Sequence, residues 1–141
     1  MTNIARTVVL VDVDGTISLR TDRDPFEWRK VGSDIPYKAV VDLLNDLVSL
    51  GQNLVFLSGR DESIRAETEF FIKKNILGTH DLHMREIGDS RPDEVVKLEI
   101  YNREILGKYQ VRFVLDDRDK VVKLWREGLG LATFQVNRGD F

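Results

Sequence analysis

Acidic, hydroxyl and guanidinium side chains come directly after three short apolar runs of this sequence. Residues 12–16 read Asp-Val-Asp-Gly-Thr, residues 58–60 read Ser-Gly-Arg, and residues 116–118 read Asp-Asp-Arg. Carboxylates gathered at one place repel one another unless a cation or a proton lies among them. Mg²⁺ suits such a place, because it is a hard ion that takes carboxylate, water and phosphate oxygens as ligands. The three motifs therefore predict a magnesium site that receives a phosphate group.

Each motif also has a simpler interpretation. An Asp-Gly pair after a strand often forms only a turn. Ser58 and the pair at residues 116–117 could cap helices, and Asp93 with Lys97 has the spacing of a surface ion pair on a helix. Independent turns and caps, however, give no reason for acids to follow two runs while a hydroxyl and an arginine follow a third. The joint pattern favours one functional site.

Strands and helices that could position these residues alternate along the chain. Buried strands are predicted at residues 7–11, 53–57 and 111–115, and weaker ones at residues 80–84 and 132–136. Apolar residues at helical spacing predict amphipathic helices between them, over Val40, Leu43, Leu44 and Leu47 and again over Leu98, Tyr101 and Ile105. Four glycines are expected to close helices, and two prolines to lie in first helical turns: Gly51, Gly78, Gly107, Gly128, Pro36 and Pro92.

Alternating strands and helices imply a mainly parallel, Rossmann-like sheet covered on both faces, because parallel strands need crossover connections. The predicted fold class is therefore an α/β three-layer sandwich, formed as a single domain over residues 1–141. In such sheets ligands bind beyond the carboxyl ends of the strands. All three polar motifs are expected at that edge.

The composition excludes several classes of protein. With 42% hydrophobic residues, 32% charged residues and only 3 prolines, the sequence has the balance of a globular domain. The absence of cysteine excludes disulfides, thiolate zinc sites and cysteine nucleophiles. A net charge of −3 means that nucleic acid must be held by a local patch. No apolar run is long enough to cross a membrane, and we expect a cytoplasmic protein, in the host cytoplasm if it is viral.

The motifs resemble those of a known superfamily. Residues 12–17 are similar to the opening motif of the haloacid dehalogenase-like (HAD) phosphohydrolases, and Ser58, Lys97 and the pair at residues 116–117 follow in the order of its other three motifs. The similarity is closer still to the 3′-phosphatase domain of the bacteriophage polynucleotide kinase-phosphatase, through residues 58–60, 85–97, 116–118 and 135–141. No kinase-type phosphate loop occurs in the sequence, so phosphate transfer from ATP is not expected.

The resemblance implies a role for each motif residue. Asp12 would attack phosphorus and become an aspartyl phosphate, while Asp14 would act as general acid and then as general base. Mg²⁺ would be bound by the Asp12 carboxylate, the Asp14 main-chain carbonyl and Asp117, with Asp116 nearby. Ser58 and Lys97 would hold the nonbridging phosphate oxygens. Thr16 would orient Asp14 through a hydrogen bond.

Substrate contacts are expected around this centre, mainly from arginines that suit phosphate oxygens. The expected set is Thr16, Arg23, Gly59, Arg60, Arg85, Asp93 and Arg118. Core helices fill most of the chain between the motifs, which leaves little for a lid, and an open site suits the end of a polymer. A neighbouring copy of the chain could supply a cover instead. Phe26 and Trp28 are candidates for stacking on bases, whereas Trp125 is expected in the core.

Three functions compete. The leading one is a Mg²⁺-dependent polynucleotide 3′-phosphatase, acting on nucleic acid 3′-phosphate ends during DNA or RNA repair, with which a separate kinase or ligase could act. The second is a HAD phosphatase for a small nucleotide or sugar phosphate. The third is a phospho-acceptor signalling domain, which ranks last because it has no need for an acid/base at the position of Asp14.

Overall fold

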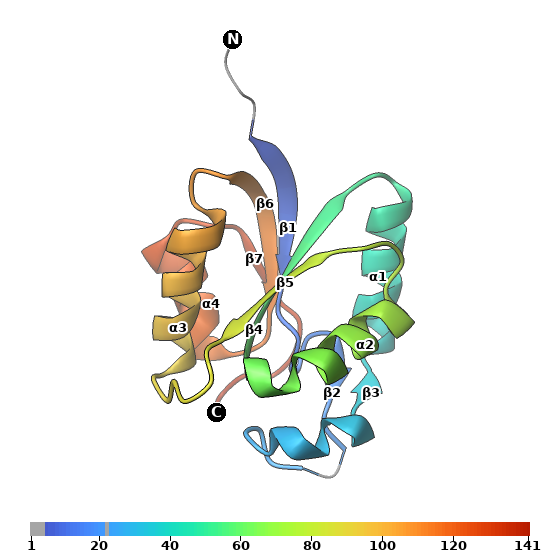
Figure 1. Cartoon of the computed structure of the whole chain (residues 1–141). Coiled ribbons are helices and arrows are strands. Elements are labelled where there is room, and N and C mark those ends of the chain that lie inside the picture. Colours follow the sequence, from blue (N-terminus) through green and yellow to red (C-terminus); the bar gives the residue numbers. More distant parts are fainter. Residues whose placement is uncertain (1–4, 22) are drawn as a thin grey trace.

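A five-stranded parallel sheet lies at the centre of the structure, which is a computed structural model that describes residues 5–21 and 23–141. Its strands are β1 (Arg6–Val11), β4 (Asn53–Asp61), β5 (Asp81–Arg85), β6 (Tyr109–Asp116) and β7 (Thr133–Gln135). Their order is β5-β4-β1-β6-β7, and every neighbouring pair is parallel. The carboxyl ends of all the strands therefore meet at one edge, at the lower side of the sheet in Figure 1.

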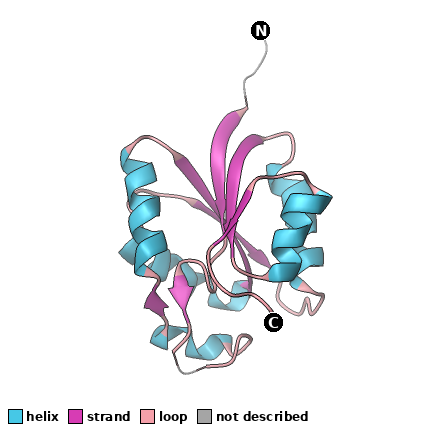
Figure 2. Cartoon of the chain, turned by 180° about the vertical axis from the view of Figure 1, so that it is seen from behind, coloured by secondary structure: helices cyan, strands magenta, loops and turns pink. Residues whose placement is uncertain are grey.

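Helices cover both faces of this sheet (Figures 1 and 2). Helices α1 (Lys38–Ser49) and α2 (Arg65–Asn75) lie on one face, and α3 (Asp93–Ile100) and α4 (Asp119–Lys123) lie on the other. Side chains of β1 alternate between the two resulting cores: Val9 packs in the cluster that contains Leu44 of α1, and Leu10 packs in the cluster that contains Ile100 of α3. Burial on both faces explains why β1 is apolar at consecutive positions. The predicted three-layer α/β sandwich is confirmed.

The strands fall where the apolar runs predict them, but the helix ends differ from prediction at three points. Pro36 lies in the short strand β3 (Ile35–Pro36), before α1 begins, and Pro92 is the N-cap of α3 and precedes its first turn. Helix α4 continues into a π-helical turn (Leu124–Gly128). Gly128 lies inside that turn, and the residue with positive φ is Gly130, at 65°. The extra residue per turn delays the end of the helix beyond the expected glycine.

One small subdomain lies beyond the carboxyl edge of the sheet. Strand β2 (Ser18–Leu19) pairs antiparallel with β3, and a 3-10 helix, η1 (Trp28–Ser33), lies between them in the sequence. Figure 1 shows this segment below the sheet, on the same side as the carboxyl ends of the strands. It agrees with the prediction that little of the chain is free to form a lid.

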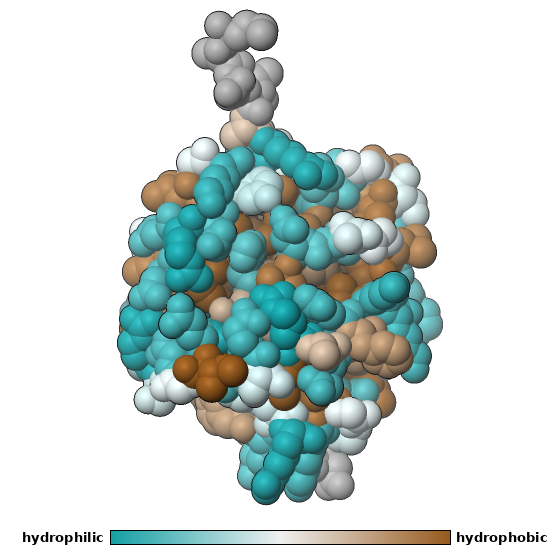
Figure 3. Space-filling model, viewed as in Figure 1, coloured by the Kyte–Doolittle hydropathy of each residue, from teal (hydrophilic) through white to brown (hydrophobic). Residues whose placement is uncertain are grey.

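Hydrophilic side chains cover most of the face seen in Figure 3, with scattered hydrophobic patches between them. Among the described residues, no helix is long and apolar enough to cross a membrane.

Candidate active site

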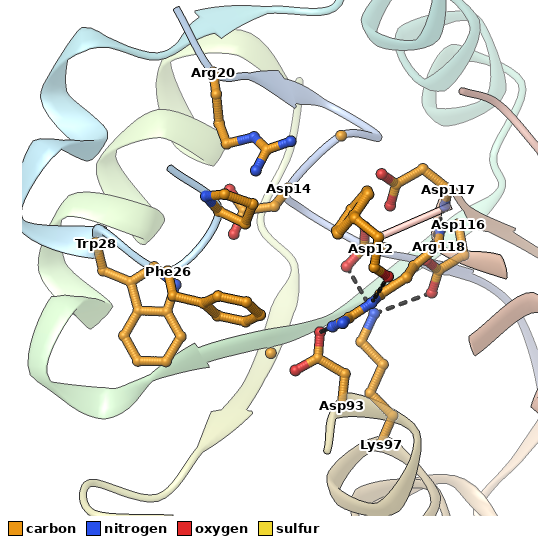
Figure 4. Close-up of a pocket in the computed structure, with 14 residues that line it drawn as sticks. Asp12, Asp14, Arg20, Phe26, Trp28, Asp93, Lys97, Asp116, Asp117 and Arg118 are labelled. Atoms are coloured by element: carbon orange, nitrogen blue, oxygen red, sulfur yellow. Dashed lines mark hydrogen bonds and ion pairs between the residues drawn. The ribbon is translucent and has the colours of Figure 1, made fainter. Parts of the chain in front are cut away.

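Three carboxylates meet at the carboxyl edge of the sheet. Asp12 follows β1, Asp116 ends β6, and Asp117 comes next along the chain. Each offers an oxygen atom within 4.8 Å of the others, and all three residues are buried. The meeting of two parallel strands predicted from the sequence thus occurs, and it gathers acids with almost no access to bulk water (Figure 4).

Lys97 lies against this cluster from α3. Its Nζ donates to Asp12 Oδ1 at 2.7 Å and to Asp116 Oδ2 at 3.0 Å. Burial alone would lower the pKa of Lys97, but the charges of Asp116 and Asp12 outweigh it and raise the pKa well above its ordinary value. The ammonium group is therefore charged at neutral pH. It is also the cation that joins the two strand ends.

One lysine does not balance three acids. Burial and the charge of Asp116 raise the pKa of Asp117 to about 7, and burial raises that of Asp12 well above its ordinary value. Among the described residues, no lysine or arginine forms an ion pair with Asp117, whereas Lys97 pairs with both Asp12 and Asp116. A buried carboxylate without a cationic partner, beside two others, offers the oxygen ligands that Mg²⁺ takes. The donor set therefore fits this ion.

Asp116 differs from its neighbours because donors surround it. Its Oδ2 accepts from Lys97 and from the indole Nε1 of Trp125, at 3.1 Å, and its Oδ1 accepts from the backbone N–H groups of Asp117, at 2.8 Å, and Arg118, at 3.3 Å. Trp125 belongs to the core, as predicted. Its hydrogen bond to the site was not predicted, since an apolar helical pattern gives no sign of where an indole N–H points.

The hydroxyl of Thr16 donates to Asp12 Oδ2 at 3.0 Å. The predicted hydrogen bond from Thr16 to Asp14 is therefore wrong. Thr16 is completely buried, and its expected contact with substrate stays a prediction. The backbone explains the difference. The N–H groups of Thr16, Ile17 and Ser18 all donate to the carbonyl oxygen of Val13, so the chain after β1 turns back on itself and places Thr16 beside Asp12.

Asp14 faces a different set of partners. Its Oδ1 accepts from Arg23 at 2.8 Å and from Arg60 at 2.7 Å, while its side chain stays 27% exposed. Both guanidinium groups also bind Asp34, which in addition accepts from the hydroxyl of Ser18. Asp34 is thus a buried member of the site that the sequence did not reveal. It precedes β3 in a weakly patterned stretch, and its partners lie far from it in sequence.

Arg23 and Arg60 were expected to contact substrate phosphates, which stays a prediction, and the structure shows another role for them. Their side chains are buried and are held by the carboxylates of Asp14 and Asp34. A guanidinium paired in this way fixes the position of a carboxylate. Both arginines therefore act on Asp14.

A second ion-paired group borders the site. Asp93, at the start of α3, accepts from Arg85 through Oδ1 and from Arg118 through Oδ2, the latter at 2.7 Å. Arg85 is buried and also donates to the carbonyl oxygens of Gly59 and Asp89. The structure thus brings together three of the expected substrate residues, and Arg85 itself is beneath the surface.

Ser58 and Gly59 end the straight part of β4, where its pairing with β5 shifts register. The Ser58 hydroxyl is buried and accepts from the backbone N–H of Arg60 at 3.1 Å, so its own proton is free to donate. A Cβ on Gly59 would lie 2.8 Å from Asp93 Oδ1. The bulge therefore needs glycine here, and Gly59 itself reaches the hollow described below.

Comparison with known proteins agrees with this geometry. Residues 6–141 match the family described as the polynucleotide kinase PNKP phosphatase domain. The chain belongs to this family. Its membership in the wider HAD superfamily, inferred above from the motifs, is confirmed by the same match.

Two kinds of relative contain a similar domain within a longer chain. A protein of Autographa californica nuclear polyhedrosis virus, named for bifunctional polynucleotide kinase/RNA ligase activity, is 34% identical over 133 residues, which are 92% of this chain and 19% of that protein. A chain in the structure of the Pnkp1/Rnl/Hen1 complex is 40% identical with a TM-score of 0.90, covering 97% of this chain and 48% of that one. A second structure, of the Pnkp1/Rnl/Hen1 RNA repair complex, gives the same values with 44% of its chain covered.

The phosphatase domain has a hollow at the centre of this constellation, seen in Figure 4, which we call the catalytic hollow. Its lining includes the carboxylates and Lys97 described above, with Gly59 and Arg118, and also the two stacking candidates Phe26 and Trp28. Three further lining residues were not assigned to the site from the sequence: Arg20, Pro25 and Phe141. Phe26 is 59% exposed, as expected for a stacking candidate, whereas Trp28 packs partly against the core. Ser58 is not among the lining residues.

Proposed function

We propose that this protein is a Mg²⁺-dependent polynucleotide 3′-phosphatase that forms an aspartyl phosphate on Asp12. The observation that carries the proposal is that Asp12 and Asp14 line one hollow while their carboxylates have different partners. Asp12 is oriented by Lys97 and Thr16, and Asp14 is oriented by Arg23 and Arg60. Two carboxylates in different surroundings can take different parts in one reaction.

The first step is the attack of an Asp12 carboxylate oxygen on phosphorus. The P–O bond to the sugar oxygen breaks, and a proton held on Asp14 moves to that leaving oxygen. In the second step Asp14 takes a proton from water, whose oxygen attacks phosphorus. The acyl phosphate bond then breaks, which releases phosphate and regenerates the Asp12 carboxylate.

Charge must be offset throughout this reaction, because an anion attacks an anion. Lys97, which lines the hollow, and the Ser58 hydroxyl, whose proton is free to donate, would bind nonbridging oxygens. Mg²⁺ would be bound by the carboxylates of Asp12 and Asp117 and the main-chain carbonyl of Asp14. There it would supply positive charge that lowers the repulsion between nucleophile and phosphate.

A polymer end fits the surroundings of the hollow. A neighbouring groove of about 600 Å³ shares Phe26, Trp28, Asp93 and Arg118 with the catalytic hollow and continues past Arg91 and Lys120. Aromatic rings and cations along one groove are the features that bind single strands.

The cellular setting that we propose is end healing in nucleic acid repair, in the cytoplasm, with a kinase or ligase supplied by a separate protein or by further parts of a longer chain. Support comes from the relatives, one named for kinase and ligase activities and another from an RNA repair complex.

Phosphate release from matched 3′-phosphate and 5′-phosphate oligonucleotides tests the proposal. We expect release from the 3′-phosphate substrate only with Mg²⁺, and none in excess EDTA. Ca²⁺ should replace Mg²⁺ poorly, because its looser and higher coordination disturbs in-line attack. Full activity in excess chelator, or equal release from 5′ ends, would contradict the proposal.

A further inference from the structure

Arg20 lies at the edge of the catalytic hollow without an ion-pair partner among the described residues. It follows β2 directly, and its side chain lines the hollow. The Nη1 atom of its guanidinium is buried and makes no hydrogen bond to any described residue. An unpaired buried donor is unfavourable, so its persistence in a ligand site indicates that an acceptor arrives with the ligand.

The other cations of the hollow are already occupied. Three cationic side chains line it, and of these Lys97 binds Asp12 and Asp116 while Arg118 binds Asp93. The lining also contains five carboxylates: Asp12, Asp14, Asp93, Asp116 and Asp117. Even with one divalent ion, a substrate that carries a second phosphate close to the scissile one needs a further positive charge. Arg20 is the lining residue that can supply it.

The position of Arg20 indicates which part of the substrate it meets. In Figure 4 its guanidinium points into the hollow on the side of Asp14, away from Lys97. Asp14 is the residue proposed to protonate the leaving oxygen, so the nucleoside must lie on that side. The aromatic ring of Phe141, 5.2 Å from Arg20 Cζ, holds the guanidinium there by a cation–π contact.

We propose that Arg20 binds the phosphate on the 5′ side of the terminal nucleoside, a second phosphate that is not hydrolysed. This inference rests on the proposed function and deepens it by defining the smallest good substrate, a nucleoside with phosphates on both its 3′ and 5′ oxygens. In a strand the second phosphate is an internucleotide diester, and in a small molecule it is a monoester. Guanidinium binds either, because both present two nonbridging oxygens.

The test compares wild type with Arg20→Ala on three substrates: an oligonucleotide 3′-phosphate, a nucleoside 3′,5′-bisphosphate and a nucleoside 3′-monophosphate. We expect Arg20→Ala to raise KM about tenfold to a hundredfold on the first two, with little change in kcat, as for the loss of one charge-assisted contact. The nucleoside 3′-monophosphate, which lacks the second phosphate, should change less than about twofold, since it makes no such contact. For the oligonucleotide, the slope of log(kcat/KM) against log[salt] should fall by about one.

Arg112→Ala is the matched control. Arg112 also stacks on a phenyl ring, with its Cζ 5.7 Å from the ring of Phe113, but it lies on β6 outside the catalytic hollow. It should leave all three substrates unchanged. Arg20→Lys, which keeps the charge, should recover part of the lost affinity.

Several outcomes separate this inference from the function on which it rests. An equal loss of kcat/KM on all three substrates would overturn the inference, because Arg20 would then serve the scissile phosphate or the fold. An Arg20→Ala variant with no loss of kcat/KM on any substrate would also overturn it. Loss on the bisphosphate but not on the oligonucleotide would exclude the strand as the source of the second phosphate. If the wild-type protein itself does not prefer 3′-phosphate ends over 5′-phosphate ends, the proposed function fails, whatever Arg20→Ala does.

Discussion

Asp12 and Asp14 are two positions apart, yet their carboxylates have no partner in common. In an extended segment side chains two positions apart point the same way, but here the chain turns immediately after β1, around the carbonyl oxygen of Val13. Asp12 therefore remains with the acids of β6, and Asp14 meets the buried arginines. This separation makes it possible for one residue to bond to phosphorus while the other moves protons.

Replacing either carboxylate by its amide tests these roles. Asp12→Asn and Asp14→Asn should each abolish phosphate release from a 3′-phosphate oligonucleotide, because they remove the nucleophile or the proton carrier at constant volume. Circular dichroism should show that both variants are folded. Asp42→Asn, on the exposed face of α1, is the control and should retain activity. Turnover by pure Asp12→Asn would mean that another group attacks phosphorus.

Asp34 is expected to act through Asp14. In Asp34→Asn two buried guanidinium groups lose a charged partner, which should destabilise the protein by about 3 kcal/mol in urea unfolding. It should also lower kcat much more than it raises KM, since Asp14 loses its fixed position.

Ser18→Ala removes a hydroxyl that donates to Asp34 and accepts from Arg60 at 3.5 Å, but it leaves the ion pairs of Asp34 in place and so separates these effects. The expected loss of stability is about 1 kcal/mol, with kcat little changed. An Asp34→Asn variant with wild-type kcat would show that Asp14 needs no such support.

The residues of the site were predictable from sequence to the extent that they sit in motifs. Asp12, Lys97, Asp116 and Asp117 meet as expected, because strand ends converge in a parallel sheet. The places of Asp34 and Arg20 in the site were not predicted. Each lies in a stretch without a periodic pattern, and its role depends on contacts with residues that are distant in sequence.

At the scale of elements, the site depends on close approach between backbones. Gly15 has φ 78°, and a Cβ on it would lie 2.0 Å from Asp117 Oδ2. Gly139 allows the C-terminal segment to pass over the end of β6, because a Cβ there would lie 1.8 Å from the carbonyl oxygen of Asp117. Both glycines belong to motifs that the sequence analysis compared with the phosphatases, and the structure gives their physical reason.

Gly15→Ala should displace Asp117 and so weaken metal binding. We expect the Mg²⁺ concentration for half-maximal activity to rise about tenfold or more, as when a group that orients a metal ligand is lost. Gly32→Ala is the control, because a Cβ at Gly32 meets nothing within 4 Å. An unchanged Mg²⁺ requirement in folded Gly15→Ala would exclude Asp117 as a ligand.

Elements themselves were predicted unevenly, for physical reasons. The three central strands β1, β4 and β6 follow from apolar runs whose side chains enter both cores. The edge strands β5 and β7 have weaker patterns, because they bury fewer side chains. Both α3 and α4 run on into π-helical turns (Tyr101–Ile105 and Leu124–Gly128), which the sequence did not predict. The first turn still closes before Gly107, as expected, whereas the second includes Gly128. The helix propensities of single residues carry little information on where such turns occur.

At the scale of the whole molecule, substrate choice depends on how much of the chain covers the catalytic hollow. Among the described residues, the small subdomain between β2 and β3 and the C-terminal segment that ends at Phe141 lie over the carboxyl edge of the sheet, and no larger lid covers it. The chain spans 19% of the curated relative and less than half of the chains in the two solved complexes. In such proteins the phosphatase domain is one part of a longer chain, and an uncovered site can receive an end that other parts hold.

Openness and net charge together predict how substrate preference depends on salt. The chain has a net charge of −3, so attraction of a polyanion must come from local cations such as Arg20 and Lys120. Wild-type protein should prefer an oligonucleotide 3′-phosphate to a sugar phosphate by kcat/KM at low salt. The preference should shrink as salt screens the strand contacts. Activity on p-nitrophenyl phosphate, which has no strand, is the control and should depend little on salt. If sugar phosphates are the better substrates at every salt concentration, the site serves small molecules, and the polynucleotide assignment is wrong.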